Sequence, residues 1–265
     1  MNSNTNNSNI NNSNTNINTK SNTKIPKIAL IGYGNMGKTI EILAKEKQIT
    51  ITNIFDINSK INPDIVYDFD VAIDFSIPDA VLENVRTISN MKKNIVIGTT
   101  AWYEKMEQIQ QLCLQNEIGC IWASNFSIGM QIFFNILSKT SQLMNKFDLY
   151  DVFINEIHHK DKSDSPSGTA RTLGNIIIDN LDSKEVILNE QINRKIKSNE
   201  LHISSLRGGS IFGTHTVYFD SVADTIELTH RAKKRDGLAE GALFAANWIL
   251  DKKGFYCFDD ILFEK

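Results

Sequence analysis

The chain has 265 residues, and its 28 lysine and arginine residues nearly balance 31 aspartate and glutamate residues, for a net charge of −3. This balance argues against a nucleic-acid partner, and the absence of an apolar run of roughly 18 residues predicts that no segment spans a membrane. Cys113, Cys120 and Cys257 are an odd number of cysteines with no close pair, which indicates reduced thiols in a cytoplasmic protein.

The first 24 residues differ in composition from the rest of the chain. Asparagine, serine and threonine make up 19 of these 24 residues, and the only hydrophobic residues besides Met1 are Ile10 and Ile17. Such a segment cannot bury enough apolar surface to offset the entropy cost of ordering it. We therefore expect residues 1–24 to form a disordered tail without a secretory signal.

Short apolar runs alternate with amphipathic stretches in the segment that follows. The runs that predict strands are 27–32, 49–55, 71–75, 95–97 and 120–123, and the stretches that predict helices are 36–47, a segment ending near residue 90, and 103–116. Buried strands that alternate with helices are typical of βαβ units and of a parallel sheet. The sequence therefore predicts an N-terminal Rossmann-type domain over residues 25–126.

The pattern changes near residue 125. A long amphipathic helix is predicted over 128–147, with Ile132, Ile136 and Leu143 among its apolar positions. The later predicted elements are a strand over 151–159, a helix over 168–181, strands over 201–206, 211–221 and 225–231, and a helix over 237–250. Consecutive strands without helices between them indicate a mixed or antiparallel sheet.

The expected fold class is therefore α/β, with two domains. The second is expected to be an α+β domain over residues 127–235, with hinges near 124–126 and 234–236. Residues 236–265 are expected to return as a helix to the first domain, because the parallel sheet otherwise lacks a cover on one face.

Gly32, Gly34 and Gly37 form the pattern G-x-G-x-x-G between the first predicted strand and the first predicted helix. In this setting the first glycine permits a tight turn, the second lets a pyrophosphate approach the backbone, and the third lets the helix pack on the strand. The N–H groups at the start of the helix, around Asn35 and Met36, attract phosphate oxygens. The motif predicts a dinucleotide-binding site.

Asp56 ends the next predicted strand, 19 residues after Gly37, where a carboxylate accepts hydrogen bonds from the adenosine ribose. Ile57 and Asn58 follow it, and neither is the arginine that would pair with a 2′-phosphate. This favours NADH over NADPH. Lys38 lies just inside the first helix and could attract that phosphate, so the expected cofactor is NADH, NADPH or both.

Two further loops leave the carboxyl ends of predicted parallel strands, where open α/β sheets bind ligands. Phe75 and Ser76 begin one loop, and Gly98, Thr99 and Thr100 form the other. We expect these residues to contact the cofactor, with the second loop beside the nicotinamide. Turn formation and helix capping by Ser76 and Thr100 remain the alternative interpretation.

The densest group of chemically active side chains lies in residues 156–170. The group has two adjacent histidines, two lysines and the start of a predicted helix: His158, His159, Lys160, Lys162, Ser167, Gly168 and Thr169. A helix start offers unpaired N–H groups to a carboxylate, and the histidines and lysines add cationic donors. These residues suit a substrate that carries carboxylates and receives a proton from a histidine or a lysine.

Strand geometry constrains how the two histidines can act. Successive side chains point to opposite faces of a strand, so His158 and His159 can contact one ligand only if the strand ends there. Glu156 is expected either to orient an imidazole or to face water. No metal site is expected, because the other histidines are scattered at positions 202, 215 and 230 and no cysteine lies nearby.

Three arginines are candidate carboxylate clamps in a cleft between the domains. Arg207 precedes a Gly-Gly turn between predicted strands, and Arg231 and Arg235 flank the second hinge. Each is by itself more typical of a surface residue, so this interpretation depends on the site at residues 156–170.

These motifs resemble those of the 4-hydroxy-tetrahydrodipicolinate reductase family, also called dihydrodipicolinate reductase. The resemblance runs from about Lys27 to the C-terminus and rests on residues 32–37, 98–100, 124–127, 156–170 and 207–215. It implies an enzyme that uses NADH or NADPH to reduce a cyclic dicarboxylate, 4-hydroxy-tetrahydrodipicolinate, to tetrahydrodipicolinate in diaminopimelate and lysine biosynthesis. It also implies a homotetramer built through the sheet of the second domain.

The resemblance implies a role for each matching residue. His158 would donate a proton, Lys162 would be its partner and anchor the substrate, and His159 would contact a carboxylate. The other implied contacts are Ser167, Gly168 and Thr169 for the second carboxylate, and Ser124, Asn125 and Phe126 for the cofactor.

Two other functions stay open from the residues alone. A dehydrogenase that acts on an acyclic acid such as aspartate would carry the same glycine motif. A non-catalytic sensor could bind the nucleotide and change its contacts with a partner, although it would leave the group of histidines and lysines unexplained.

Overall fold

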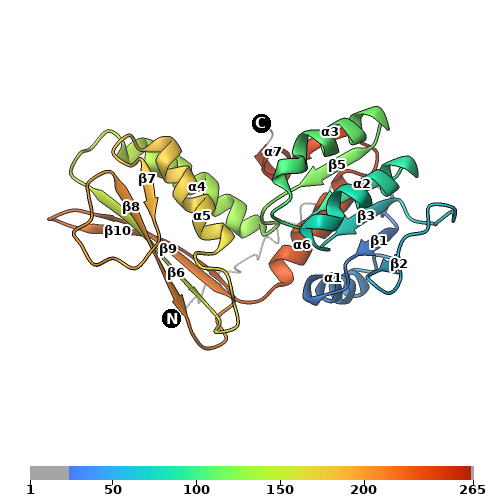
Figure 1. Cartoon of the computed structure of the whole chain (residues 1–265), viewed down its shortest axis with the longest axis horizontal. Helices are drawn as coiled ribbons and strands as arrows, with labels where there is room; N and C mark the ends of the chain where they lie inside the picture. Colours follow the sequence, from blue (N-terminus) through green and yellow to red (C-terminus); the bar gives the residue numbers. More distant parts are fainter. Residues whose placement is uncertain (1–23, 264–265) are drawn as a thin grey trace, which may run out of the picture.

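The structure is a computed structural model that describes residues 24–263, and this part of the chain folds around two β-sheets that lie side by side (Figure 1). The expected α/β class, with one parallel and one mixed sheet, is confirmed. The predicted disordered tail lies outside the described residues, apart from Lys24. Within residues 24–263, no helix is both long enough and apolar enough to cross a membrane.

The first sheet is parallel throughout, in the order β11-β5-β4-β3-β1-β2. Its strands are β1 (Ile28–Ile31), β2 (Ile51–Phe55), β3 (Val71–Asp74), β4 (Asn94–Ile97), β5 (Gly119–Trp122) and β11 (Gly254–Cys257), and its helices are α1 (Asn35–Glu46), α2 (Val81–Asn90), α3 (Met106–Gln115) and α6 (Asp236–Trp248). Ile28 and Leu30 join the core with α1 and α6, whereas Ala29 and Ile31 join the core with α2 and α3. Both faces are covered, which explains why the strands are continuous apolar runs.

The C-terminal segment completes this first sheet. Helix α6 packs against α1 and contacts β3 and β4, and β11 then pairs with β5 as an edge strand before α7 (Phe258–Phe263). Between the sheets the chain crosses at residues 123–127 and again at 233–235. The elements not predicted from the sequence are β11, α7 and β7 (Val186–Leu188), because these short segments are not the fully buried apolar runs that mark strands such as β1 and β3.

The second sheet is mixed, in the order β10-β9-β6-β8-β7, with β8 parallel to β6 and β7 and with β9 antiparallel to β6 and β10. Its other elements are β6 (Asp151–His158), β8 (Glu200–Arg207), β9 (Gly213–Asp220), β10 (Thr225–Ala232), α4 (Ile128–Met144) and α5 (Gly168–Asn180). The two helices cover one face (Figure 1), where Val152, Ile154 and Val217 join their core. The other face carries Phe153 and Tyr218, whose stacked rings have centroids 4.8 Å apart.

The long helix predicted over 128–147 is present as α4, but the three apolar positions named for it do not lie in its core. Ile132, Ile136 and Leu143 are 46%, 46% and 56% exposed, and the helix instead buries residues such as Phe133 and Leu137. Apolar residues occur around much of this helix, so the sequence does not single out the buried side. The other predicted strands and helices are present, with small shifts at their ends.

Candidate active site

The glycine motif forms a tight turn at the carboxyl end of β1. Gly32 has a φ angle of 88°, and a Cβ atom on it would lie 2.4 Å from the carbonyl oxygen of Phe75. A Cβ atom on Gly37 would lie 2.4 Å from the carbonyl oxygen of Gly32, whereas one on Gly34 would have no atom within 4 Å. The turn is therefore closed at its two ends and open at Gly34, as the approach of a phosphate requires.

Helix α1 begins beside this open space with its first N–H groups available. Gly34 is its N-cap, and no described side chain caps the helix. Asn35 and Lys38 are exposed there, whereas Met36 packs against the core. Lys38 Nζ lies 5.9 Å from the ring centroid of Tyr33. The uncapped helix start favours an anion at this position.

Asp56 follows β2, directly beside the glycine turn. The backbone N–H of Gly32 donates to the carbonyl oxygen of Phe55 at 2.8 Å, which holds the two strand ends together. Asp56 Oδ1 accepts hydrogen bonds from the N–H groups of Asn58 at 2.8 Å and Ser59 at 2.9 Å. The carboxylate is thus held in place at the edge where the sequence predicts the ribose.

A buried carboxylate joins the two loops that follow β3 and β4. Asp74 Oδ1 accepts hydrogen bonds from the Ser76 N–H at 2.8 Å and from Thr99 Oγ1 at 3.1 Å. Burial raises the pKa of Asp74 above its ordinary value. Thr99 is consequently turned inward, whereas Thr100 is exposed.

The rings of Phe75 and Phe126 lie next to this pair of loops. A Cβ atom on Gly98 would lie 2.2 Å from the Phe75 ring, so the ring packs directly against Gly98. Phe126 is buried, with its ring centroid 6.3 Å from that of Phe75, whereas Ser124 is exposed and Asn125 half-buried. The structure thus places Phe126 in the core that the first sheet shares with α1 and α6.

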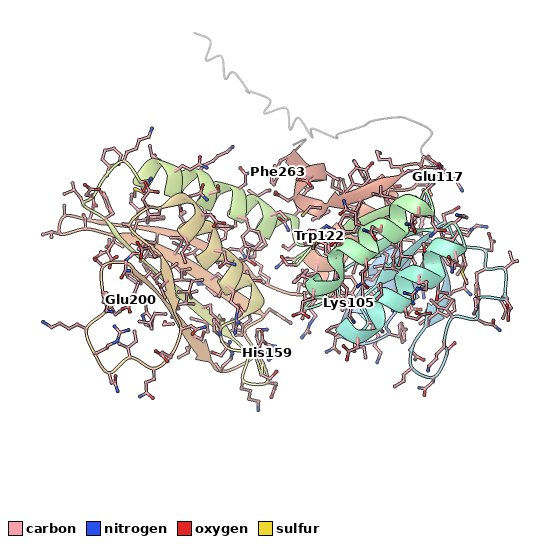
Figure 2. All side chains as sticks on the ribbon, turned by 45° about the horizontal axis from the view of Figure 1, so that its top comes forward. Lys105, Glu117, Trp122, His159, Glu200 and Phe263 are labelled. Atoms are coloured by element: carbon pink, nitrogen blue, oxygen red, sulfur yellow. The ribbon has the colours of Figure 1, made fainter. Side chains whose placement is uncertain are left out.

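The predicted substrate residues meet at a cavity of about 570 Å³ beside the second sheet. Strand β6 ends at His158, and both His158 and His159 line the cavity, together with Lys162 and Thr169. The geometric condition for two adjacent histidines to contact one ligand is therefore met. In Figure 2, His159 lies at the end of the second sheet that is nearer to the first sheet.

Cations outnumber anions in the wall of this cavity. Besides the histidines and Lys162, its charged lining residues are Arg231, Lys233, Lys234, Arg235, Asp236 and Glu240. Lys234 pairs with Asp236, and the guanidinium carbon of Arg235 lies 5.4 Å from the ring centroid of Phe212. Such a wall suits a ligand with more than one negative charge.

Glu156 is fully buried behind the catalytic candidates. One of its carboxylate oxygens, Oε2, contacts Nδ1 of His158. The other, Oε1, accepts hydrogen bonds from Nη2 of Arg207 at 2.7 Å and from the N–H of Ser167 at 3.3 Å. Burial alone would raise the pKa of Glu156, but the hydrogen bonds from His158 and Arg207 outweigh it and lower the pKa from 4.5 to about 2. Glu156 thus orients an imidazole rather than facing water.

His215 lies against His158 from the neighbouring strand β9. The ring centroids are 5.1 Å apart, and Nε2 of His215 lies 3.2 Å from Oγ of Ser167. Its Nδ1 has no hydrogen-bond partner among the described residues. Burial, followed by the charge of His158, lowers the pKa of His215 from 6.5 to about 3. His215 is therefore neutral near pH 7.

The expectation that His202, His215 and His230 are scattered is wrong for two of them in the folded structure. His215 and His230 both line the cavity with His158, because β9 and β10 pair next to β6. Among the described residues, Glu156, His158 and His215 have donor atoms within 4.8 Å of one another, the one group that could share a metal ion. The Glu156 carboxylate already binds His158 and Arg207, so we assign this group no metal.

The start of α5 supplies the remaining predicted contacts. Ser167 is buried, and its Oγ accepts a hydrogen bond from the N–H of Ala170 at 3.2 Å, so its side chain caps the helix and does not line the cavity. Gly168 is exposed next to it and does not line the cavity either. Thr169 does line the cavity, and its Oγ1 accepts a hydrogen bond from Nδ2 of Asn125 at 3.3 Å.

Arg207 is not a free carboxylate clamp, so that expectation is wrong. Its Nη2 donates to Glu156 and, at 2.7 Å, to the carbonyl oxygen of Asp164. Lys162 Nζ also bonds Asp164, at 2.7 Å from Oδ1. In this structure the direct partner of His158 is consequently Glu156, and Lys162 faces the same cavity from the loop before α5.

Sequence reasoning gave no site role to His215 and left that of Glu156 open. Glu156 and His158 stand two residues apart on β6, and this spacing predicts that they share one face of the strand. The register then pairs Glu156 with His215 of β9 and His158 with Arg207 of β8. No local pattern in the sequence shows that pairing.

Comparison with known proteins places the chain in a family. The model described as dihydrodipicolinate reductase, N-terminus, matches residues 26–126, and the one described as dihydrodipicolinate reductase, C-terminus, matches residues 129–262. A 4-hydroxy-tetrahydrodipicolinate reductase of Christiangramia forsetii is 40% identical over 237 residues, which are 89% of this chain and 97% of the relative. One of Methanococcus aeolicus is 36% identical over 227 residues, which are 84% of this chain and 77% of the relative.

A solved structure shares the fold. It is a dipicolinate-bound dihydrodipicolinate reductase from Paenisporosarcina sp. TG-14, with a TM-score of 0.71 at 23% identity, covering 90% of this chain and 100% of that chain. Together, the two family models account for nearly all of the residues that the structure describes. The chain therefore belongs to the dihydrodipicolinate reductase family.

Proposed function

We propose that this chain is an NAD(P)H-dependent 4-hydroxy-tetrahydrodipicolinate reductase, an oxidoreductase of diaminopimelate and lysine biosynthesis. The observation that carries the proposal is the convergence of His158, His159, Lys162 and Thr169 on one cation-lined cavity at the end of β6. The substrate carries two carboxylates, which cations and helix N–H groups bind. The names of the relatives support this substrate.

Within this proposal, His158 donates the proton that accompanies reduction. His159 and Lys162 bind one carboxylate, and Thr169 with the backbone N–H groups at Gly168 binds the other. Ser167 acts indirectly, because its side chain caps α5 and so fixes the position of those N–H groups.

The cofactor would be held by the glycine turn, the uncapped start of α1 and Asp56. The fit is supported by the open space at Gly34, where a Cβ atom would have no neighbour within 4 Å. When bound, the reduced nicotinamide supplies a hydride to the substrate ring. The proposed contacts along the carboxyl edge of the first sheet are Gly32, Gly34, Asn35, Met36, Gly37, Lys38, Asp56, Phe75, Ser76, Gly98, Thr99, Thr100, Ser124, Asn125 and Phe126.

Cofactor preference follows from the charges next to Asp56. The two residues after it bring no cation to the ribose, which favours NADH. The exposed Lys38 beside the glycine turn would still attract a 2′-phosphate. A side-by-side rate comparison with NADH and NADPH tests this balance, and a strong preference for NADPH would contradict it.

We further propose that residues 25–126 are the dinucleotide-binding domain, that 127–235 bind substrate and form the oligomer, and that 236–265 return to the first domain. The proposed assembly is a homotetramer in the cytoplasm, built through the face of the second sheet that α4 and α5 leave uncovered. The stacked pair Phe153 and Tyr218 lies on that face.

The test of the function is loss of reduced-nicotinamide absorbance when the product of the preceding synthase reaction is supplied. His158→Gln and Lys162→Ala should each lose most turnover while NADH still binds, and Lys160→Ala, at an exposed neighbouring position, is the matched control. Near-wild-type rates for both site variants would refute the assigned roles. Turnover of aspartate instead of the cyclic substrate would favour the other dehydrogenase, and cofactor binding without any turnover would favour a sensor.

A further inference from the structure

Glu156 combines full burial with a charge, a combination that proteins keep only where the charge is paired. Its two oxygens face different partners: Oε2 contacts His158 Nδ1, and Oε1 takes the hydrogen bonds of Arg207 and Ser167. Because each oxygen is engaged, the carboxylate cannot rotate without losing contacts on both sides.

We propose that Glu156, clamped by Arg207, is the positioning residue that fixes the ring orientation and tautomer of His158 for proton transfer. The inference rests on the proposed function, in which His158 is the proton donor. An ionised carboxylate only accepts hydrogen bonds, so Nδ1 of His158 must carry a proton. The proton that is transferred is therefore the one on Nε2.

The space in front of Nε2 supports this assignment. A Cβ atom on Gly213 would lie 2.9 Å from His158 Nε2, so the absence of a side chain at residue 213 keeps the nitrogen accessible. Once the Nε2–H bond breaks and the proton passes to the substrate, the ring is a neutral imidazole that keeps its Nδ1–H on Glu156. The carboxylate thus stabilises the imidazolium before transfer and holds the ring afterwards.

Arg207 keeps this carboxylate charged and ties it to the rest of the site. Its Nη2 lies 2.7 Å from Glu156 Oε1 and 2.7 Å from the carbonyl oxygen of Asp164. The same guanidinium therefore braces the loop that carries Lys162. Without it, Glu156 would be a buried charge with a single ionic partner, which is strongly unfavourable.

The charged and titratable groups around His158 come from several elements. They are Glu156 on β6, Arg207 on β8, His215 on β9, His230 and Arg231 on β10, Lys233, Lys234, Arg235, Asp236 and Glu240 from the second crossing segment and α6, and His159, Lys162 and Asp164 in the loop before α5. Glu156 is the acidic group in direct contact with the imidazole. Its removal would leave the imidazolium facing Arg207 and Lys162 without a paired anion.

Glu156→Gln tests the proposal, because it keeps the size of the side chain and removes its charge. We expect kcat to fall by about 10-fold to 10⁴-fold, the range in which orienting carboxylates act, with little change in KM. The alkaline limb of the kcat profile should move to lower pH, because the imidazolium loses its partner. Glu156→Asp keeps the charge, so the alkaline limb of its plot of kcat against pH should stay at the wild-type position.

Glu117→Gln is the matched control, since this glutamate is exposed and far from the cavity. It should leave kcat and the pH profile unchanged. A Glu156→Gln variant that keeps both the wild-type kcat and the wild-type pH profile would overturn the proposal.

A second measurement on the unmodified chain does not depend on how the variant folds. In protein labelled with ¹⁵N-histidine, the neutral form of His158, assigned by comparison with His158→Gln, should be the Nδ1–H tautomer. The Nε2–H tautomer would overturn the positioning role. If the chain folds but does not reduce the cyclic substrate, the proposed function fails, whereas the tautomer still reports on Glu156 and His158.

Discussion

At the scale of single residues, the absence of a side chain at Gly213 leaves room for Nε2 of His158, the proposed proton donor. A Cβ atom at this residue would come within 2.9 Å of His158 Nε2, so Gly213→Ala must displace the imidazole or fill the space beside it. Because misplacement by about 1 Å can cost roughly 10²-fold in rate, we expect at least a 10-fold loss of kcat with NADH binding unchanged.

Gly209→Ala is the control for that substitution, since Gly209 also has a positive φ, of 55°, and a Cβ atom there would meet nothing within 4 Å. The two variants are compared by their kcat values from steady-state kinetics and by their NADH affinities from titration. Equal kcat values for Gly213→Ala and the wild type would contradict the account of Nε2.

His215 should make stability depend on pH. Burial holds its pKa at about 3 instead of 6.5, so the unfolded chain binds this proton at a higher pH than the folded chain does. His215 therefore contributes stability above pH 6.5 that is lost as the pH falls toward 3. The pKa of Glu156 is lowered from 4.5 to about 2, so Glu156 also loses its contribution to stability as the pH falls, but over this lower pH range.

Urea unfolding between pH 6.5 and 5.5 tests His215 above the range in which Glu156 contributes, and a His215→Gln variant is needed because burial also lowers the pKa of His202 and His230. The unfolding free energy of the wild type should fall across this range, and that of His215→Gln should fall less. The same decline in both proteins would show that His215 is not held neutral by burial.

At the scale of elements, two glycines of the turn have different roles, one in folding and one in binding. A side chain at Gly37 would collide with the backbone of Gly32, whereas one at Gly34 would meet nothing within 4 Å. Gly37→Ala should therefore lower the melting temperature, and Gly34→Ala should melt like the wild type but bind NADH more weakly. Thermal melts and NADH titration test the pair, and a Gly34→Ala variant with wild-type affinity would contradict the phosphate role.

The elements also show how far the sequence predicts this site. His158, His159, Lys162 and Thr169 lie in one short stretch, so their common cavity is foreseeable once β6 is expected to end there. Arg207 and His215 reach Glu156 through the register of β6 with β8 and β9. A hydrophobic period predicts that these strands exist and not which of them pair, so these partners could not be foreseen.

At the scale of the whole molecule, the two candidate half-sites belong to different sheets. The glycine turn lies at the edge of the first sheet, and the cation-lined cavity lies beside the second. Asn125, in the first crossing segment, lines the cavity and bonds Thr169. Both crossing segments therefore contribute to the cavity wall, the second through Lys233, Lys234 and Arg235.

The proposed assembly makes a prediction at the same scale. Phe153 stacks on Tyr218 on the uncovered face of the second sheet, so Phe153→Asp should place a charge in the tetramer interface and give a smaller species in light scattering. Ile132→Asp is the control, because Ile132 is similarly exposed but lies on α4. Equal masses for Phe153→Asp and the wild type would argue against this face.

In the proposed reaction, the imidazole of His158 contacts a ring with two carboxylates at the end of β6. A crystal structure of the full chain with NADH and dipicolinate tests it most directly. We expect the ring within hydrogen-bond reach of His158 Nε2, roughly 3 Å, with its carboxylates on Lys162 and Thr169. A ring bound elsewhere, with His158 turned away from it, would contradict the account.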